Sequence, residues 1–145
     1  MNQRIDYPSV SPSGLDAMQA LERYLHKSPL GQPLLELVRI RASQLNGCAY
    51  GIDMHTKLAR ANGETEQRIY ALSAWRETTF FNEPERAALA WTEALTHIHT
   101  GVSDQEYISV RLHFDKAQLV DLTYAIVAIN GWNRIATAFR KEPGT

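Results

Sequence analysis

Apolar residues recur along this chain at steps of three and four positions, and helix stop signals interrupt the pattern at short intervals. That period is typical of amphipathic helices, which place every third or fourth residue on one face. Two such runs end in an Asn-Gly pair, at 46–47 and 62–63, because these residues tolerate the positive φ of a helix C-terminus. No stretch of six residues alternates apolar with polar side chains between turn signals. The sequence therefore predicts an all-α fold.

Helix start signals divide the chain further. Three capping-box pairs, each a short polar residue followed three positions later by Glu or Gln, occur at 82–85, 103–106 and 115–118. No repeat, linker or low-complexity tract separates the segments, so we expect a single-domain helical bundle over residues 1–145 with about six to eight helices. The expected segments are roughly 13–26, 33–46, 48–62, 65–76, 83–100, one from 103, 115–129, and 132–139, which continues the last helix after an interruption at Gly131.

Composition excludes several classes of protein. The chain has 145 residues, 44% hydrophobic and 21% charged, which is ordinary globular usage. Lys and Arg number 15 against 16 Asp and Glu, for a net charge of -1, so the basic footprint of a nucleic-acid binder is absent. No run of about 18 apolar residues predicts a membrane span, and the N-terminal residues lack the apolar stretch of a secretory signal. We therefore expect no nucleic-acid or membrane partner and a cytoplasmic location.

The segment 119–129 is apolar nearly all round. A helix of that kind is stable when it is covered on every side. In a domain of this size a second copy of the chain can supply that cover, so we expect a homo-oligomer.

The residues with the clearest chemical potential lie between positions 36 and 55. Cys48, the one cysteine, excludes an intrachain disulfide and sits at an expected helix start, where free N–H groups and the helix dipole stabilise a thiolate. His55 follows seven positions later, two turns along the same face. Glu36 precedes Cys48 by twelve positions, on the neighbouring helix. A thiol, an imidazole and a carboxylate are the parts of a proton relay around a reactive sulfur.

Spacing alone leaves the alternative open that Cys48 is a small buried hydrophobe, the commonest role of a lone cysteine. Other candidates are weaker. His97 and His99 are two positions apart and point to different sides of a helix, so no metal site is expected. The tryptophans, among apolar neighbours, are expected in the core: Trp75, Trp91 and Trp132.

The segment from Cys48 to Thr65 resembles the core motif of the AhpD-like alkylhydroperoxidases, in the carboxymuconolactone decarboxylase superfamily. That motif reads C-x-x-C-x-x-x-H-x-x-x-A-x-x-x-G-x-T, with a Glu twelve positions before its first Cys. Six residues are in register: Glu36, Cys48, His55, Ala59, Gly63 and Thr65. The flanks 37–43 and 132–134 are also of the family's type, and the likeness extends from about Leu34 to Phe139.

The resemblance implies an AhpD-like helical fold, a dimer, trimer or hexamer, and a thiol peroxidase without a cofactor or metal. In such enzymes the second motif cysteine attacks the hydroperoxide, the first resolves the sulfenic acid as a disulfide, and the His and Glu move protons. Here the second position is Gly51. A Gly within a helix costs about 1 kcal/mol relative to Ala, and we expect it to leave an open notch between Cys48 and His55, with Tyr50 and Gly51 as pocket residues.

The two-cysteine cycle cannot run in this chain, so we expect a weakened peroxidase with Cys48, His55 and Glu36 as catalytic residues and an external thiol as reductant. One alternative is a redox-independent enzyme like the decarboxylase branch of the superfamily, in which His55 and Glu36 move protons on a small organic acid. Possible anion-binding residues for that reaction are Arg39, Arg41 and Arg134. Another is a non-catalytic oligomeric binding scaffold.

Overall fold

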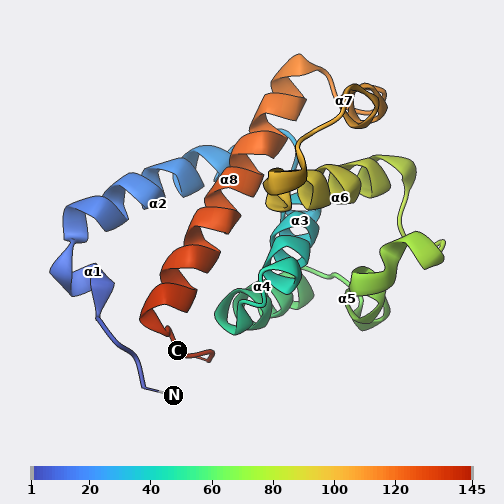
Figure 1. Ribbon diagram of the computed structural model, residues 1–145. Coiled ribbons are helices and arrows are strands. Elements are labelled where there is room, and N and C mark those ends of the chain that lie inside the picture. Colours follow the sequence, from blue (N-terminus) through green and yellow to red (C-terminus); the bar gives the residue numbers. More distant parts are fainter. Residues whose placement is uncertain (1, 145) are drawn as a thin grey trace.

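The computed structural model describes residues 2–144 and contains eight α-helices and two short 3-10 helices (Figure 1). Residues 2–144 contain no strand, so the predicted all-α class and number of helices are confirmed. In chain order the elements are α1 (Tyr7–Val10), α2 (Pro12–His26), α3 (Gln32–Leu45), α4 (Ala49–Ala61), α5 (Glu66–Ala71), η1 (Leu72–Glu77), α6 (Glu83–Thr96), η2 (Ile98–Thr100), α7 (Asp104–Arg111) and α8 (Lys116–Phe139).

All three capping boxes form as the sequence predicts, at the starts of α6, α7 and α8. In each, the polar side chain accepts a hydrogen bond from the third helical N–H, and the Glu or Gln side chain accepts one from the cap N–H. These bonds satisfy donors that the first helical turn leaves unpaired.

Three expected boundaries differ. The helix expected over 83–100 ends at Thr96, and η2 follows after the non-helical His97. The segment 65–76 does not form one helix, because α5 ends at Ala71 and η1 follows with a non-helical Ala74 at φ -123° and ψ 34°. Conversely, α8 runs through Gly131 without a break for 24 residues. An internal Gly costs only about 1 kcal/mol, which the packing of a long buried helix outweighs.

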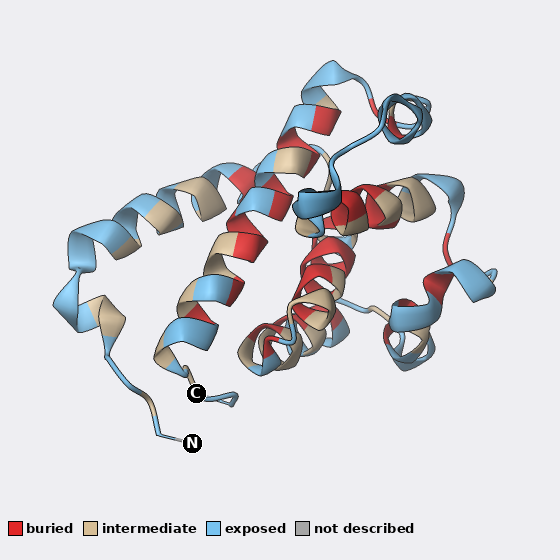
Figure 2. Cartoon of the chain, viewed as in Figure 1, coloured by how far each residue is buried: buried red, intermediate tan, exposed pale blue. Residues whose placement is uncertain are grey.

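Helix α3 lies at the centre of the fold and packs against α4, α6 and α8 (Figure 1). Its buried apolar residues face all three neighbours: Leu35, Leu37, Val38, Ile40 and Ala42. By contrast, α2 lies along α8 at the edge of the molecule and buries a single residue, Leu25 (Figure 2). The chain is therefore densely packed around α3 and loosely packed beneath α2.

The apolar segment of α8 is covered on one side only. Val120, Tyr124 and Val127 are 50%, 47% and 56% exposed. They recur at steps of four and three, so they form one stripe on the outer face of α8. The expectation that this helix is surrounded on every side is not met by a single copy of the chain.

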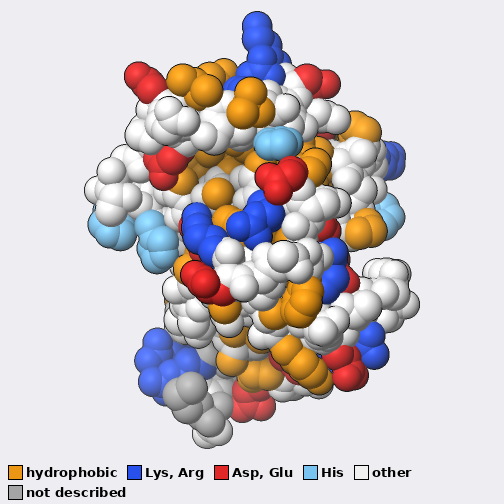
Figure 3. Space-filling view, turned by 90° about the vertical axis from the view of Figure 1, so that its right-hand side faces the viewer, with side chains coloured by type: hydrophobic (Ala, Val, Ile, Leu, Met, Phe, Trp, Pro, Cys, Tyr) orange, Lys and Arg blue, Asp and Glu red, His pale blue; other side chains and the backbone are white. Residues whose placement is uncertain are grey.

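The face that carries α5, α6 and α7 shows basic, acidic and apolar side chains interspersed (Figure 3). Within residues 2–144, no helix is long and apolar enough to cross a bilayer.

Candidate functional site

A cavity of about 790 Å³ lies between α2, α3, α4 and α8, with α1 and Lys141 at its edge. Each helix contributes residues at steps of three or four, so each turns one face toward the cavity. On α4 this face carries Cys48, the residue before its first turn, followed by Gly51, His55, Leu58 and Asn62.

Helix α3 supplies a polar stripe within its otherwise apolar sequence. Gln32, Glu36, Arg39 and Ser43 occur at steps of four, three and four and therefore share a face. Three of them are buried: Glu36 at 6%, Arg39 at 5% and Ser43 at 0% exposure. A charged side chain is stable at such depth only when it is paired, so each needs a partner within the fold.

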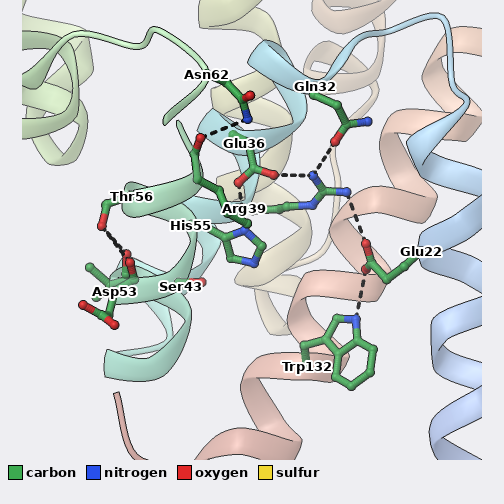
Figure 4. A network of polar contacts seen from close by, with 12 residues as sticks. Glu22, Gln32, Glu36, Arg39, Ser43, Asp53, His55, Thr56, Asn62 and Trp132 are labelled. Atoms are coloured by element: carbon green, nitrogen blue, oxygen red, sulfur yellow. Dashed lines mark hydrogen bonds and ion pairs between the residues drawn. The ribbon is translucent and has the colours of Figure 1, made fainter. Parts of the chain in front are cut away.

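Glu36 is paired on both sides: with Arg39 of the same helix and with His55 across the α3–α4 contact (Figure 4). Glu36 Oε2 lies 2.8 Å from His55 Nδ1, and Glu36 Oε1 accepts a hydrogen bond of 2.7 Å from Arg39 Nη1. The sequence analysis assigned Glu36 and His55 to one proton relay, and the structure brings the two side chains into direct contact.

The contact with His55 and Arg39 keeps Glu36 ionised. Burial alone raises the pKa of the Glu36 carboxyl, but the hydrogen bond and charge of His55 and the charge of Arg39 outweigh it and hold that pKa below its ordinary value. Glu36 is therefore a carboxylate near neutral pH and accepts the Nδ1–H of His55. The second ring nitrogen, Nε2, points away from Glu36, toward the side where Trp132 lies (Figure 4).

The network continues from Arg39 to helices α2 and α8. Arg39 Nη2 lies 3.3 Å from Glu22 Oε2, and Glu22 Oε1 accepts a hydrogen bond of 2.9 Å from Trp132 Nε1. Gln32 accepts a further bond of 3.0 Å from Arg39. Trp132 thus lines the cavity and is only half-buried, which corrects its predicted place in the core, whereas Trp75 and Trp91 are buried as expected. Trp132 still packs against the buried cluster of Leu25, Leu35, Ala125 and Ala128, and its indole N–H donates to Glu22 at the cavity.

Cys48 lies at the opposite end of α4 from Asn62, 3% exposed and still lining the cavity. Its backbone is extended, at φ -90° and ψ 98°, and it occupies the cap position before Ala49. Within residues 2–144 its side chain makes no capping hydrogen bond. The N–H groups of the first turn of α4 therefore have no side-chain acceptor from Cys48.

Two tyrosines, Tyr7 and Tyr50, line the cavity together with Cys48. Burial raises the pKa of the Tyr7 phenol, and the neighbouring Tyr50, Asp6 and Cys48 raise it further. Tyr7 therefore stays protonated near neutral pH, and its hydroxyl is a hydrogen-bond donor at the edge of the cavity. Lys141 lies 5.9 Å from the ring centre of Tyr50. Tyr50, predicted as a pocket residue, lines the cavity, and Tyr7 is an additional wall residue.

Gly51 lines the cavity as predicted, but the expected open notch at this position is wrong. A Cβ added to Gly51 would lie 2.5 Å from Ser43 Oγ and 2.8 Å from Asn133 Nδ2, closer than packed atoms approach. Asn133 donates a hydrogen bond of 3.0 Å to Ser43 and accepts one of 2.9 Å from Asn46. These side chains fill the space, so Gly51 permits a close approach of α4 to α3 and α8.

All five predicted site residues line one cavity: Glu36, Cys48, Tyr50, Gly51 and His55. Two predicted anion-binding residues lie elsewhere, because Arg41 pairs with Glu93 and Arg134 bonds to Asn130. His97 and His99 are exposed, and within residues 2–144 no group of three His, Cys, Asp or Glu side chains is arranged to hold a metal ion.

Sequence reasoning missed Glu22, Trp132 and the role of Arg39 in holding Glu36. The polar stripe inside the apolar α3 sequence is the signal that points to Arg39. Glu22 carries no comparable signal, because α2 is largely exposed and its polar residues look like a solvated face.

Several known proteins resemble this chain in sequence or in fold. Residues 12–94 match the carboxymuconolactone decarboxylase family. The uncharacterised protein YdfG of Bacillus subtilis is 48% identical over 139 residues, which cover 95% of both chains. A protein of unknown function from Agrobacterium tumefaciens, described as a candidate AhpD antioxidant defence protein, is 43% identical, with a TM-score of 0.96 over 99% of both chains. The debrominase Bmp8 shares the fold, with a TM-score of 0.85 at 17% identity over 94% of this chain and 74% of its own.

Proposed function

This chain belongs to the carboxymuconolactone decarboxylase family, and from that membership and the geometry of its cavity we propose that it reduces hydroperoxides with Cys48 as the reacting thiol. The observation that carries the proposal is that Cys48 and the Glu36–His55 pair open into the same cavity. The likeness to a candidate antioxidant defence protein of the same size supports it.

The proposed reaction uses Cys48 as the nucleophile and His55 as the acid and base. The Cys48 thiolate attacks the outer oxygen of a hydroperoxide ROOH, the O–O bond breaks, and a sulfenic acid and ROH result. His55 Nε2 takes the thiol proton and returns one to the departing alkoxide. Because the two residues are seven positions apart, about 10 Å along the helix axis, water molecules in the cavity carry the proton between them. Glu36 stabilises the imidazolium that forms.

Regeneration needs an outside thiol, because Cys48 is the single cysteine of the chain. One thiol condenses with the sulfenic acid to give a mixed disulfide and water, and a second releases the Cys48 thiol as the reductant becomes a disulfide. The cycle uses no metal or organic cofactor. Its rate depends on how readily a small thiol enters the cavity.

The test is hydroperoxide consumption with dithiothreitol as reductant. We expect Cys48→Ser to abolish turnover and His55→Gln to lower it by about a hundredfold or more. Mass spectrometry of the protein after one equivalent of peroxide should show one added oxygen on Cys48. Turnover by Cys48→Ser within twofold of the parent protein contradicts the proposal.

A second candidate is proton transfer on a small organic acid by His55 and Glu36 without the thiol. The observation that favours it is that the Glu36–His55 contact is complete without Cys48. Alkylation of Cys48 distinguishes the two, because it stops the peroxidase and leaves acid–base chemistry running wherever the substrate still fits. A non-catalytic binding scaffold is the outcome if neither activity is found.

We also propose that the chain is a homo-oligomer in which a second copy covers the apolar stripe of Val120, Tyr124 and Val127. Light scattering on a sizing column should give at least twice 16.4 kDa. Tyr124→Lys should shift the protein toward monomer, because a charge in an apolar interface must be desolvated.

A further inference from the structure

A second, smaller cavity of about 230 Å³ adjoins the main one. The two share three wall residues: Tyr7, Leu15 and Trp132. The remaining walls of the second cavity are mostly apolar and come from α2 and the C-terminal half of α8, including Met18, Ile135 and Phe139. An apolar recess thus lies beside the end of the main cavity that holds Tyr7.

The other end of the main cavity is basic. Arg23 and Lys27 line it at the C-terminal end of α2, and neither forms an ion pair within residues 2–144. The whole lining holds four Lys or Arg side chains and two Glu, and both Glu side chains are already paired to Arg39. The cavity therefore has an excess of positive charge in a chain whose net charge is -1, and that excess attracts an anion.

The reacting groups lie between these two ends. Along α2, Leu15 faces the apolar recess, Glu22 contacts Trp132 and Arg39, and Arg23 comes directly after it. Along α4, Cys48 lies near Tyr7, and His55 is two turns further, toward the Glu36–Arg39 network. Both helices thus run from the apolar end to the basic end, with Cys48 and His55 between.

We propose that the substrate is a long-chain carboxylic acid hydroperoxide, bound with its carboxylate at Arg23 and Lys27, its hydroperoxide between Cys48 and His55, and its alkyl tail in the recess beyond Trp132. This identification of the substrate rests on the proposed peroxidase function. A neutral, small hydroperoxide would leave both ends of the cavity without a partner, whereas an acid with a mid-chain hydroperoxide meets a cation, a thiol and an apolar wall in that order.

Binding tests the proposal independently of turnover. The probe is dodecanoate, titrated calorimetrically into the purified full-length protein, with dodecan-1-ol as the uncharged analogue. We expect dodecanoate to bind more tightly than the alcohol. Arg23→Gln combined with Lys27→Gln should weaken dodecanoate binding about tenfold. The matched control, Lys57→Gln with Lys116→Gln, removes two exposed cations outside the cavity and should change it less than twofold.

The tail is tested by filling the recess. Met18→Trp occupies the second cavity and should weaken dodecanoate binding about tenfold, the effect of about two fewer buried methylene groups. Ile135→Phe, on the opposite wall, is the second variant in case Met18→Trp does not fold, and circular dichroism checks both. Equal dodecanoate affinity in the cation pair and its control, or no binding at all, overturns the proposal.

Turnover separates this inference from the peroxidase function. With dithiothreitol as reductant, we expect kcat/KM for a linoleic acid hydroperoxide to exceed that for tert-butyl hydroperoxide at least about tenfold. If the small hydroperoxide is reduced and the acid is no better, the peroxidase stands and the substrate class is wrong. If neither is reduced but dodecanoate binding depends on Arg23 and Lys27, the cavity is an acid-binding site and the peroxidase function fails.

Discussion

Two glutamates of this chain, Glu36 and Glu93, are both paired with arginines of helix α3, but their other partners give them different chemical roles. Arg39 bonds to Glu36 on the cavity side of α3, and Arg41, two positions later, bonds to Glu93 of α6 at 2.9 Å. Residues two apart point to different sides of a helix. For Glu93, burial raises the carboxyl pKa, but hydrogen bonds from Arg76 and Arg41 outweigh it, so that pKa is lowered, as it is for Glu36.

The difference lies in the other partners. Glu93 is surrounded by Arg41, Arg76 and the indole N–H of Trp75, with Arg76 stacked on the Trp75 ring. All of these donors keep their protons near neutral pH, so Glu93 can only hold α3, α6 and η1 together. Glu36 instead contacts an imidazole that faces a cavity. An ion pair becomes chemically useful when one partner can exchange a proton with something that enters.

We expect the largest loss of stability when each network loses its α3 arginine. Arg39→Met leaves Glu36 buried beside His55 alone and should lower the free energy of unfolding by about 3 kcal/mol, the usual cost of breaking a buried pair. Arg41→Met should cost about 1 kcal/mol, because Glu93 keeps Arg76 and is less deeply buried. Urea unfolding followed by circular dichroism measures both. Equal losses would show that the networks are equivalent.

Removing the charge of each glutamate should separate chemistry from structure. Glu36→Gln keeps the size of the side chain but no longer stabilises an imidazolium or fixes the His55 tautomer, so peroxidase turnover should fall about a hundredfold. Glu93→Gln should leave turnover within twofold while lowering the melting temperature. Steady-state kinetics with tert-butyl hydroperoxide and thermal unfolding are the two measurements. A comparable loss of turnover in Glu93→Gln would refute the distinction.

Gly51 gives a further contrast with the two ion-pair networks, because the side chains packed against it, Ser43 and Asn133, are neutral. Gly51→Cys restores the two-cysteine spacing, but its Cβ collides with Ser43 Oγ, so we expect a loss of about 1–2 kcal/mol of stability from overpacking. Adding Ser43→Ala removes the colliding oxygen and should recover part of that loss. Only in this double variant do we expect a 48–51 disulfide and a gain in turnover with a dithiol.

Thiol titration after peroxide treatment, together with denaturant unfolding, checks this prediction. Gly51→Ser with Ser43→Ala is the matched control, because it fills the same space without a second thiol. An unstrained single Gly51→Cys variant would show that Ser43 and Asn133 move aside readily.

The smallest expected effect is on acid stability. Glu36 and Glu93 both have a lowered pKa in the folded chain, so each contributes stability above the ordinary Glu pKa of about 4.3, and that stability is lost as pH falls through the folded pKa. The unfolding free energy should therefore decline below about pH 4.5. Each single Gln variant should show a shallower decline, and an unchanged slope in both would contradict the assigned pKa directions.

The helices were largely predictable, because caps and periodicity act within a few residues. The capping boxes at Asn82, Ser103 and Asp115 form as expected. The errors fall where longer-range packing overrides a local signal: α8 passes through Gly131, and the 65–76 segment bends at Ala74. The contact of Glu36 with His55 was also accessible, because motif spacing placed both in one relay.

The sequence by itself determined that this chain is all-α, that its one thiol begins a helix, and that an acid and a base accompany it. Only the tertiary structure decided that His55 and Arg39 hold Glu36 ionised, that Trp132 lines a cavity as well as packing against the core, and that Ser43 and Asn133 occupy the space beside Gly51. The physical reason is the distance along the chain over which each kind of interaction acts. Helix formation depends on neighbours three or four positions away, whereas a cavity and its ion network join side chains from helices far apart in the chain, whose positions are fixed by packing around α3.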